Sequence, residues 1–384
     1  MRLAIVLGLL FVACSTRGVP QEGTKHAAAE PRPELAVPNP SAGGTPKNSA
    51  DARAPSFVLK GGNVFGVGKR NLRIDGGRVV AVGVSVGDTD RIVDVTGRYI
   101  VPGFIDSHVH LAYDPVGDEL LASGIVAVLD LAAPLATLSD GHGALRVLNS
   151  GPMITAKLGY PTTSWGSAGY GLEVTSPATA VAAVQTLFAA GAQVIKVPLT
   201  AAPTLDDPTV KAIVAAAHQH KLKVFTHALE EVNAARAAAD GIDVLAHTPT
   251  EALSDATLDA WKTRTVISTL SAFGGGAAAV KNLQQLHQRG ARVLYGTDLG
   301  NTRDTNIQAG EITLLLAAGF DGASIVNAGT SIPAEFLGLT DLGSLDVGKR
   351  ASFLVLAGDP SVDPHTLSEP IAVYVDGALV SAGL

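Results

Sequence analysis

The sequence has too few cysteines for a disulfide bond and no cluster of basic residues for binding nucleic acid. Its 384 residues include one cysteine, Cys14, so an internal disulfide is excluded. Only 16% of the residues are charged, the formal net charge is −7, and no run of lysine and arginine stands out. Because nucleic-acid binding calls for a basic patch, this composition argues against such a partner. The 47% of hydrophobic residues can instead fill a large core.

The apolar stretch near the start is too short to span a bilayer. Residues 3–13 contain 11 mostly apolar residues, whereas a spanning helix needs about 20. They suit a signal peptide over residues 1–13. The segment up to Cys14 resembles a bacterial lipoprotein signal, which implies export and lipid attachment at Cys14, and Ser15 favours the outer membrane. Phe11 replaces the usual leucine, so a soluble periplasmic protein is the alternative.

The next segment has a composition that is typical of a linker. Residues 15–55 contain seven prolines among Gly, Ala, Ser and Lys, with few large apolar side chains. Such a chain has too little apolar surface to bury, so residues 14–55 are predicted to be a lipidated cysteine followed by a disordered tether.

From residue 56 onward the sequence predicts an α/β protein. Short apolar runs recur near residues 103–107, 124–130, 152–156, 193–197, 222–226, 242–246, 264–269 and 291–296. Helical segments are expected between several of them, over residues 177–190, 208–220, 230–240 and 277–289. Eight strands that alternate with helices predict a (β/α)8 TIM barrel over residues 104–340. The β-rich ends, residues 56–103 and 341–384, predict a small β-sandwich domain built from both ends of the chain.

Six residues able to bind a metal ion fall at the ends of the predicted strands. They are His108, His110, Lys196, His227, His247 and Asp298. His108 and His110 point to one face because side chains alternate along a strand. A barrel gathers the carboxyl ends of its strands into one mouth, so these residues are expected to converge there as a metal site.

Each residue also has a plainer interpretation when it is taken alone. His227 or His247 could be an ordinary buried histidine, and Asp298 could cap the following helix. Lys196 is harder to explain in this way, because a buried lysine needs a partner or a changed charge. The joint pattern favours the metal site.

Several motifs resemble those of the amidohydrolase superfamily. They are VPGFIDSHVH at residues 101–110, Lys196, His227, His247, GTD at residues 296–298, and flanking segments at residues 59–64, 342–350 and 373–377. The resemblance covers the chain from about residue 56 and points to its imidazolonepropionase-like and dipeptidase-like members. It implies two divalent metal ions, expected to be zinc, with Lys196 carboxylated. It assigns His108, His110 and Asp298 to one ion, and His227 and His247 to the other.

The chemistry that this resemblance implies is hydrolysis. A hydroxide bridging the two metals would attack the carbonyl, and Asp298 would carry the proton to the leaving nitrogen. The expected reaction is cleavage of a C–N amide bond in a dipeptide or an N-acyl amino acid. A cyclic amide, an imidazolone or a lactone is the alternative substrate. An alternative of another class is a periplasmic binding lipoprotein without turnover, which would not need a proton acceptor such as Asp298.

Substrate recognition is expected in the loops after the strands. The third loop contributes Tyr160, Trp165 and Tyr170, which would bind a small-molecule substrate or merely pack the loop on the barrel. Arg303 could pair with a substrate carboxylate or, alternatively, with the neighbouring Asp304. Asp130 is expected to orient a metal ligand from behind.

Overall fold

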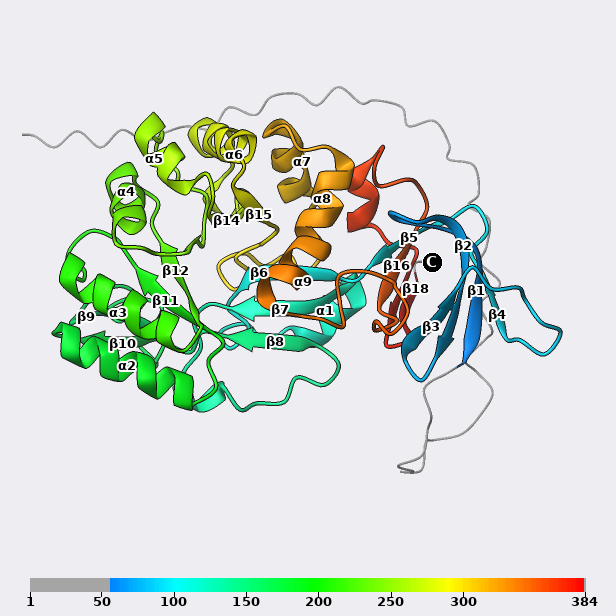
Figure 1. Cartoon of the computed structure of the whole chain (residues 1–384), viewed down its shortest axis with the longest axis horizontal. Helices are drawn as coiled ribbons and strands as arrows, with labels where there is room; N and C mark the ends of the chain where they lie inside the picture. Colours follow the sequence, from blue (N-terminus) through cyan, green and yellow to red (C-terminus); the bar gives the residue numbers. More distant parts are fainter. Residues whose placement is uncertain (1–55, 383–384) are drawn as a thin grey trace, which may run out of the picture. The chain divides into compact units, whose positions relative to one another are not determined.

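Strands and helices alternate through the middle of the chain in the computed structural model, which describes residues 56–382 (Figure 1). The strands of this region are β6 (Phe104–Val109), β7 (Ile125–Asp130), β8 (Arg146–Asn149), β9 (Met153–Ala156), β10 (Gly171–Val174), β11 (Val194–Pro198), β12 (Lys223–His227), β13 (Val244–Leu245), β14 (Thr265–Ile267) and β15 (Arg292–Leu294). The helices are α1 (Gly117–Ser123), α2 (Pro177–Ala189), α3 (Asp207–Gln219), α4 (Glu231–Ala239), α5 (Asp255–Trp261), α6 (Ala277–Arg289), α7 (Ala309–Ala317), α8 (Gly322–Gly329) and α9 (Ser331–Leu337), with 3₁₀ turns η1 (Leu135–Thr137), η2 (Ser271–Phe273) and η3 (Pro364–Ser368).

The structure describes the chain from residue 56 onward. The predicted signal peptide, Cys14 and the tether, residues 1–55, lie outside them. Within residues 56–382, no helix combines the length and the apolar character needed to cross a bilayer.

The central strands are parallel and form a barrel-like arrangement. Hydrogen bonds join them in the orders β6-β7-β8, β9-β10 and β11-β12-β13-β14-β15. The segment after β15 lies against β6, because Ser107 N donates to Tyr295 O (2.9 Å) and His110 N to Leu299 O (2.7 Å). The first and the last strand regions are therefore neighbours, as the predicted barrel requires.

The third strand region contains more strands than the sequence predicted. The strand expected near residues 152–156 is β9, but β8 also pairs with β7, and β10 pairs with β9. Between β8 and β9, Gly151 has a φ of +66° and Pro152 has no N–H to give to a ladder. The break separates β9, which confirms the predicted run, from β8, which the sequence analysis did not predict.

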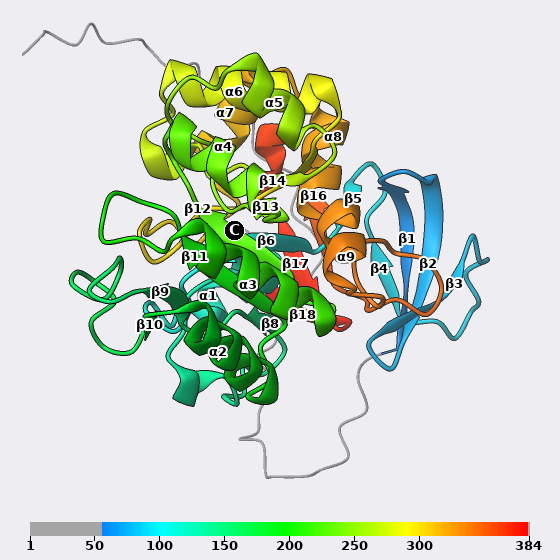
Figure 2. The ribbon, with the colours of Figure 1, turned by 60° about the vertical axis from the view of Figure 1, so that its left-hand side comes forward.

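The helices begin where polar caps precede them. Ser176 accepts a hydrogen bond from Thr179 N at the start of α2, and Asp206 accepts one from Thr209 N at the start of α3. Such caps satisfy backbone N–H groups that have no partner inside the helix. The four predicted helices start and end within one residue of α2, α3, α4 and α6. Figure 2 shows α2 and α3 side by side on the outside of the strands.

Strands from both ends of the described chain share one sheet. The N-terminal strands are β1 (Phe57–Val64), β2 (Gly68–Asp75), β3 (Arg78–Val82), β4 (Ile92–Asp94) and β5 (Tyr99–Pro102), and the C-terminal strands are β16 (Phe353–Leu356), β17 (Ala372–Val375) and β18 (Ala378–Ala382). The order is β18-β17-β16-β5-β1-β2-β3, and β4 pairs with β1. The rings of Phe353 and Tyr374 stack at 4.7 Å in the core of this sheet. The chain thus leaves this sheet at β5, runs through the central strands and returns at β16.

Candidate metal centre

The structure brings the predicted ligands together at the carboxyl ends of the central strands. His108 is in β6, Lys196 is in β11 and His227 ends β12, while the remaining ligands follow β6, β13 and β15. The ring centres of His108 and His247 are 4.4 Å apart, and those of His227 and His247 are 4.7 Å apart. The ring centre of His110 lies 5.1 Å from that of His108. Residues separated by up to 190 positions therefore form one cluster.

His108 and Asp298 face each other with atoms that can only accept. The Nδ1 atom of His108 is 2.8 Å from the carbonyl oxygen of Ala246, so Nδ1 carries the ring proton. The other nitrogen, Nε2, then bears a lone pair and lies 3.4 Å from Asp298 Oδ1. Both atoms are buried and lack a hydrogen-bond partner. Two lone pairs in such a position call for a cation between them.

His247 and His110 extend this acceptor cluster. The Nδ1 atom of His247 is 3.1 Å from Thr269 Oγ1. Ligand atoms of His108, His247 and Asp298 all lie within 4.8 Å of one another, close enough to hold one metal ion. His110 Nε2 lies 3.1 Å from Asp298 Oδ1, and its Nδ1 has no hydrogen-bond partner. The donor set of imidazole nitrogens and a carboxylate fits zinc or a similar divalent ion.

Burial keeps these histidines in the form that binds metal. It lowers the pKa of His227 to about 3, and it lowers the pKa values of His108 and His247 well below the usual range. Neutral imidazole is the form that donates a lone pair to a metal. Burial alone would raise the pKa of Asp298, but the neighbouring imidazoles of His108 and His110, together with the hydrogen bond from Asn301, outweigh it and lower that pKa. Asp298 is therefore an anion at neutral pH.

Lys196 is the one basic side chain enclosed by this cluster. It is fully buried, and its Nζ atom has no hydrogen-bond partner. Burial lowers the pKa of Lys196 to about 7, so a large share of the side chain is a neutral amine at neutral pH. Its charged form also lowers the pKa values of His108 and His227, which shows that it faces the same space.

Asp106 positions the cluster, and the sequence analysis did not select it. Its Oδ1 atom accepts hydrogen bonds from His108 N (3.0 Å) and Thr297 N (3.1 Å), and its Oδ2 accepts one from Thr297 Oγ1. This carboxylate thereby fixes β6 against the segment that carries Asp298. A signal was present, since Asp106 stands two residues before His108 in a buried strand and shares its face. Thr269, which holds His247, had no such signal.

The Asp298 backbone adopts an uncommon conformation. Its φ is +55°, in the left-handed region that Asp tolerates better than most residues. The Asp298 N–H donates to His108 O over 2.8 Å, and Asn301 Nδ2 donates to Asp298 Oδ2 over 3.1 Å. These contacts hold the carboxylate against the histidines.

Two of the predicted aromatic residues contact the candidate ligands. The ring of Trp165 lies 5.0 Å from that of His110, and the ring of Tyr160 lies 5.2 Å from that of His227. Trp165 Nε1 donates to the Tyr160 hydroxyl over 2.8 Å, which joins them into one wall. Tyr170 packs on Trp165 and donates its hydroxyl to Ala112 O over 3.0 Å. Its polar end is therefore used within the protein.

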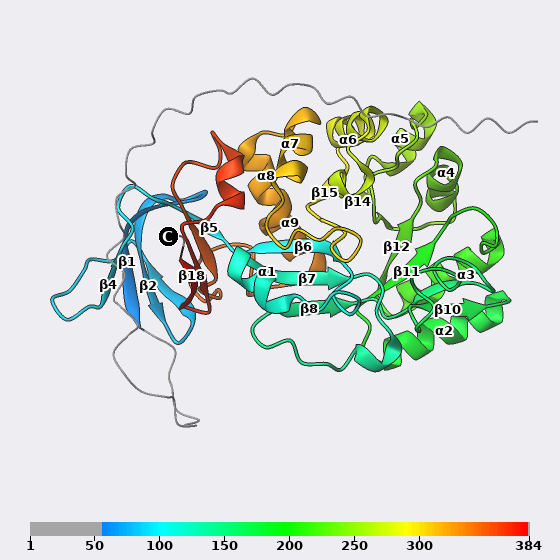
Figure 3. The same cartoon turned by 180° about the vertical axis from the view of Figure 1, so that it is seen from behind.

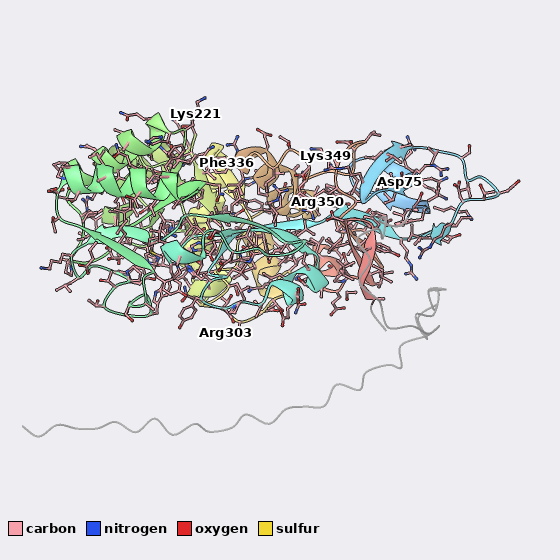
Figure 4. The ribbon with its side chains drawn as sticks, turned by 90° about the horizontal axis from the view of Figure 1, so that it is seen from below. Asp75, Lys221, Arg303, Phe336, Lys349 and Arg350 are labelled. Atoms are coloured by element: carbon pink, nitrogen blue, oxygen red, sulfur yellow. The ribbon has the colours of Figure 1, made fainter. Side chains whose placement is uncertain are left out.

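Asp130 and Arg303 lie near the cluster without joining it. Asp130 accepts hydrogen bonds from Ala112 N (2.8 Å) and Ala132 N, and burial raises its pKa to about 6. Arg303 pairs with Asp114 over 2.8 Å, and its side chain is 68% exposed. The alternative pairing with Asp304 is wrong, because Asp304 accepts from Asn306 instead. Figure 4 shows Arg303 at the edge of the molecule opposite Lys221.

Comparisons with known proteins agree with this site. The model of the amidohydrolase family matches residues 99–380, so the chain belongs to this family of enzymes. An adenine deaminase from Desulfatibacillum aliphaticivorans is 26% identical over 319 residues, which cover 77% of this chain and 53% of the relative. The chain thus spans about half the length of that relative.

Two solved structures share the fold. A Xaa-Pro dipeptidase with bound methionine in its active site is similar with a TM-score of 0.73 and 19% identity, over 85% of this chain and 99% of the other. A putative prolidase from Bifidobacterium longum is similar with a TM-score of 0.72 and 24% identity, over 86% of this chain and 96% of the other.

Proposed function

We propose that this protein is a metal-dependent hydrolase that cleaves a C–N amide bond in a dipeptide or an N-acyl amino acid. The observation that carries the proposal is the pair of unpartnered acceptors, His108 Nε2 and Asp298 Oδ1, at 3.4 Å in a buried cluster of histidines. Such a pair is costly to bury unless a cation binds it. Membership of the amidohydrolase family supports hydrolysis.

The cluster has enough ligands for two divalent ions. We expect zinc, with His108, His110 and Asp298 on one ion and His227 and His247 on the other. A carboxylated Lys196 would add two anionic oxygens between them. The buried, unpartnered Nζ with a pKa near 7 supports this step, because a neutral amine can react with CO2. Bound ions of this kind polarise a carbonyl and lower the pKa of water.

In this proposal Asp298 carries the proton from the attacking water to the leaving nitrogen. Asn301 holds its Oδ2, while Oδ1 faces the histidines and has no hydrogen-bond partner. An anionic carboxylate in this position can take a proton from the attacking water and deliver it to the leaving nitrogen. The burial of the cluster excludes bulk water and strengthens each charge interaction. No covalent intermediate is required.

The aromatic wall supports the choice of substrate. Tyr160 and Trp165 offer flat apolar surfaces beside His227 and His110, which suit a proline ring or another apolar side chain. The structural neighbours described as a Xaa-Pro dipeptidase and a prolidase support the same class of substrate. The relative described as an adenine deaminase supports the broader class of C–N hydrolysis.

Metal analysis followed by a substrate screen tests this proposal. The purified protein should hold about two zinc equivalents per chain, since each ion needs several protein ligands. The screen contains Xaa-Pro and Xaa-Leu dipeptides, N-acyl amino acids, cyclic amides, lactones and adenine. Turnover of the first two groups supports the proposal, and turnover of a cyclic amide or lactone alone supports the alternative. Tight binding of a compound without turnover would indicate a binding protein.

Two further features belong to the same proposal. We expect the central strands to close into a full (β/α)8 barrel, which the hydrogen bonds between β6 and residues 295–299 support, and the sheet of both chain ends to pack as a sandwich. We also propose that the protein is exported and anchored through lipid at Cys14, on the strength of the sequence pattern alone.

A further inference from the structure

A buried glutamate of α7 lies outside the ligand cluster. Glu311 is in the first turn of this helix, and its side chain is fully buried. No lysine or arginine among residues 56–382 forms an ion pair with it. A carboxylate is costly to bury without hydrogen bonds or an opposite charge, so its hydrogen-bond partners indicate its role. Figure 3 shows α7 between α6 and α8, above β14 and β15.

Both oxygens of Glu311 bind the backbone of one turn, residues 269–273. Oε1 accepts a hydrogen bond from Leu270 N over 3.0 Å, and Oε2 accepts one from Ser271 N over 2.7 Å. Hydrogen bonds to a carboxylate are stronger than those between neutral groups. The helix also approaches this turn closely, because a Cβ added at Gly310 would lie 3.3 Å from Ser271 Oγ. The carboxylate therefore fixes the turn against α7.

The first residue of this turn has a strained backbone. Thr269 is buried and has a φ of +38°, in a region that branched side chains rarely adopt. Such strain persists where the surroundings hold it, and the carboxylate of Glu311 holds the next two residues. The Oγ1 atom of Thr269 lies 3.1 Å from Nδ1 of His247. The strain is thus located at a contact with a candidate metal ligand.

The last residue of the turn contacts the same ligand. The ring centre of Phe273 lies 4.8 Å from that of His247. Because Thr269 contacts Nδ1 of His247, Nε2 is the ring nitrogen left for an ion. In the neutral ring, Nε2 has a free lone pair only when Nδ1 carries the proton and the Thr269 hydroxyl accepts the hydrogen bond.

We propose that Glu311 is a positioning residue of the candidate metal centre. It fixes residues 269–273, so that Thr269 accepts a hydrogen bond from His247 Nδ1 and Phe273 packs on the same ring. His247 then presents Nε2 to the ion in one orientation. This role rests on the proposed function in one respect, that His247 is a metal ligand, and it does not require turnover.

Nuclear magnetic resonance of the metal-free full chain, labelled with nitrogen-15 in the histidine rings, tests the contact. Burial lowers the pKa of His247 well below the usual range, so at neutral pH its spectrum reports which nitrogen carries the proton. That proton should be on Nδ1, and both Glu311→Gln and Thr269→Val should lower its share there. His247→Gln assigns the signals. A proton on Nε2 in the wild type, or unchanged His247 signals in Glu311→Gln, would overturn the proposal.

Zinc affinity, measured by competition with a chelating dye, tests whether Glu311 acts through Thr269. Thr269→Val should weaken zinc binding about tenfold, the lower end of the range for partners of ligating histidines. Glu311→Gln puts an amide N–H against a backbone N–H, and should weaken it about three- to tenfold. In the Thr269→Val background, the same change should add less than about twofold, because effects that share one contact are not additive. Fully multiplying losses would mean that Glu311 acts independently of Thr269, which contradicts the proposal.

The matched control is Asp321→Asn, at an exposed carboxylate that accepts a hydrogen bond from Ser324 N at the start of α8. It should keep the zinc affinity and the His247 signals of the wild type. Should Glu311→Gln fail to fold, Glu311→Asp takes its place in each comparison, since it keeps the charge but is one methylene shorter. A wild type that binds no zinc would refute the proposed function, whereas the spectra of the metal-free chain would still decide the role of Glu311.

Discussion

At the scale of single residues, the candidate site depends on which buried atoms carry protons. The Ala246 carbonyl fixes the proton of His108 on Nδ1, and Thr269 contacts the Nδ1 of His247. The carbonyl contact leaves the Nε2 lone pair of His108 free for the interior of the cluster. Outer contacts of this kind set the orientation and the basicity of metal ligands. The same cluster keeps Asp298 anionic, the form that its proposed roles as metal ligand and proton acceptor require.

Replacing Asp298, the proposed proton acceptor, separates that role from metal binding. Asp298→Asn keeps the size and one ligating oxygen but removes the negative charge, so kcat should fall by about 10²–10⁴, the range of general acid–base groups. Steady-state kinetics on the best substrate of the screen, with metal content measured in parallel, checks this. Asp304→Asn, in the same loop, is the control and should keep kcat. Near-normal kcat in Asp298→Asn would assign the proton transfer to another group.

Replacing the buried lysine tests the second set of ligands. Lys196→Ala removes the proposed bridging anion, so at least one metal equivalent and nearly all activity should be lost. Added propionate should restore part of both, because it brings anionic oxygens into the space that the side chain left. Lys281→Ala, at an exposed lysine of α6, should retain metal and activity. A Lys196→Ala protein with both metals and full turnover contradicts a role for this residue.

At the scale of elements, the carboxylate of Asp106 connects β6 to the segment that follows β15. Asp106 in β6 accepts from the backbone of His108 and from both the backbone and the hydroxyl of Thr297. Few backbone hydrogen bonds join β6 to the residues after β15. The Asp106 side chain therefore helps to align these two segments with each other. A small shift there would separate His108 from Asp298.

Removing this connection should cost stability and metal together. Asp106→Ala leaves three donors without their acceptor in a buried region, so the free energy of unfolding should fall by about 2–4 kcal/mol. Urea unfolding followed by circular dichroism measures the loss. Asp206→Ala, which removes the cap of α3, should cost only about 1 kcal/mol. Equal losses in the two variants would show that Asp106 is an ordinary polar contact.

The third loop contributes the aromatic wall of the site. Trp165→Leu removes the ring against His110 and the donor to Tyr160, so kcat/KM should fall about tenfold or more for substrates with a ring, through lost apolar contact. Metal content should not change, since Trp165 is not a ligand. The matched control is Phe188→Leu on α2, where the ring stacks on His220 away from the site. An unchanged kcat/KM would mean that the wall only packs the loop.

The sequence predicted periodic elements well and irregular ones poorly. The helices at α2, α3, α4 and α6 follow from apolar spacing and polar caps, which act locally. The short strands β8 and β10 were missed, because each exists through its pairing with a neighbouring strand rather than through a local pattern. In the same way, the histidines were recognisable by type and place, whereas Thr269 became important only through its contact with His247. Arg303 forms an ion pair with Asp114, which lies 189 positions away in the sequence. Local sequence patterns could not predict this pairing.

At the scale of the whole molecule, residues 56–382 contain both the sheet shared by the two ends of the described chain and the candidate metal centre. The proposed export and anchoring concern residues 1–55, which lie outside the described residues. Location and catalysis are thus separate questions that separate experiments answer.

Fractionation of wild type and Cys14→Ala in a Gram-negative bacterial host decides the location. The wild type should sediment with the membranes and carry an acyl mass, because buried acyl chains contribute about 0.8 kcal/mol per CH₂ and more than one chain gives stable anchoring. Cys14→Ala should lose the acyl mass and leave the membrane fraction, while its metal content and kcat stay unchanged. Cys14→Ser is the control of similar size and should behave like Cys14→Ala, because the thiol is the group that lipid would modify. If the intact wild type is soluble, unacylated and retains residues 1–13, the proposed export is wrong, and the metal centre at the ends of β6, β12 and β13 is unaffected.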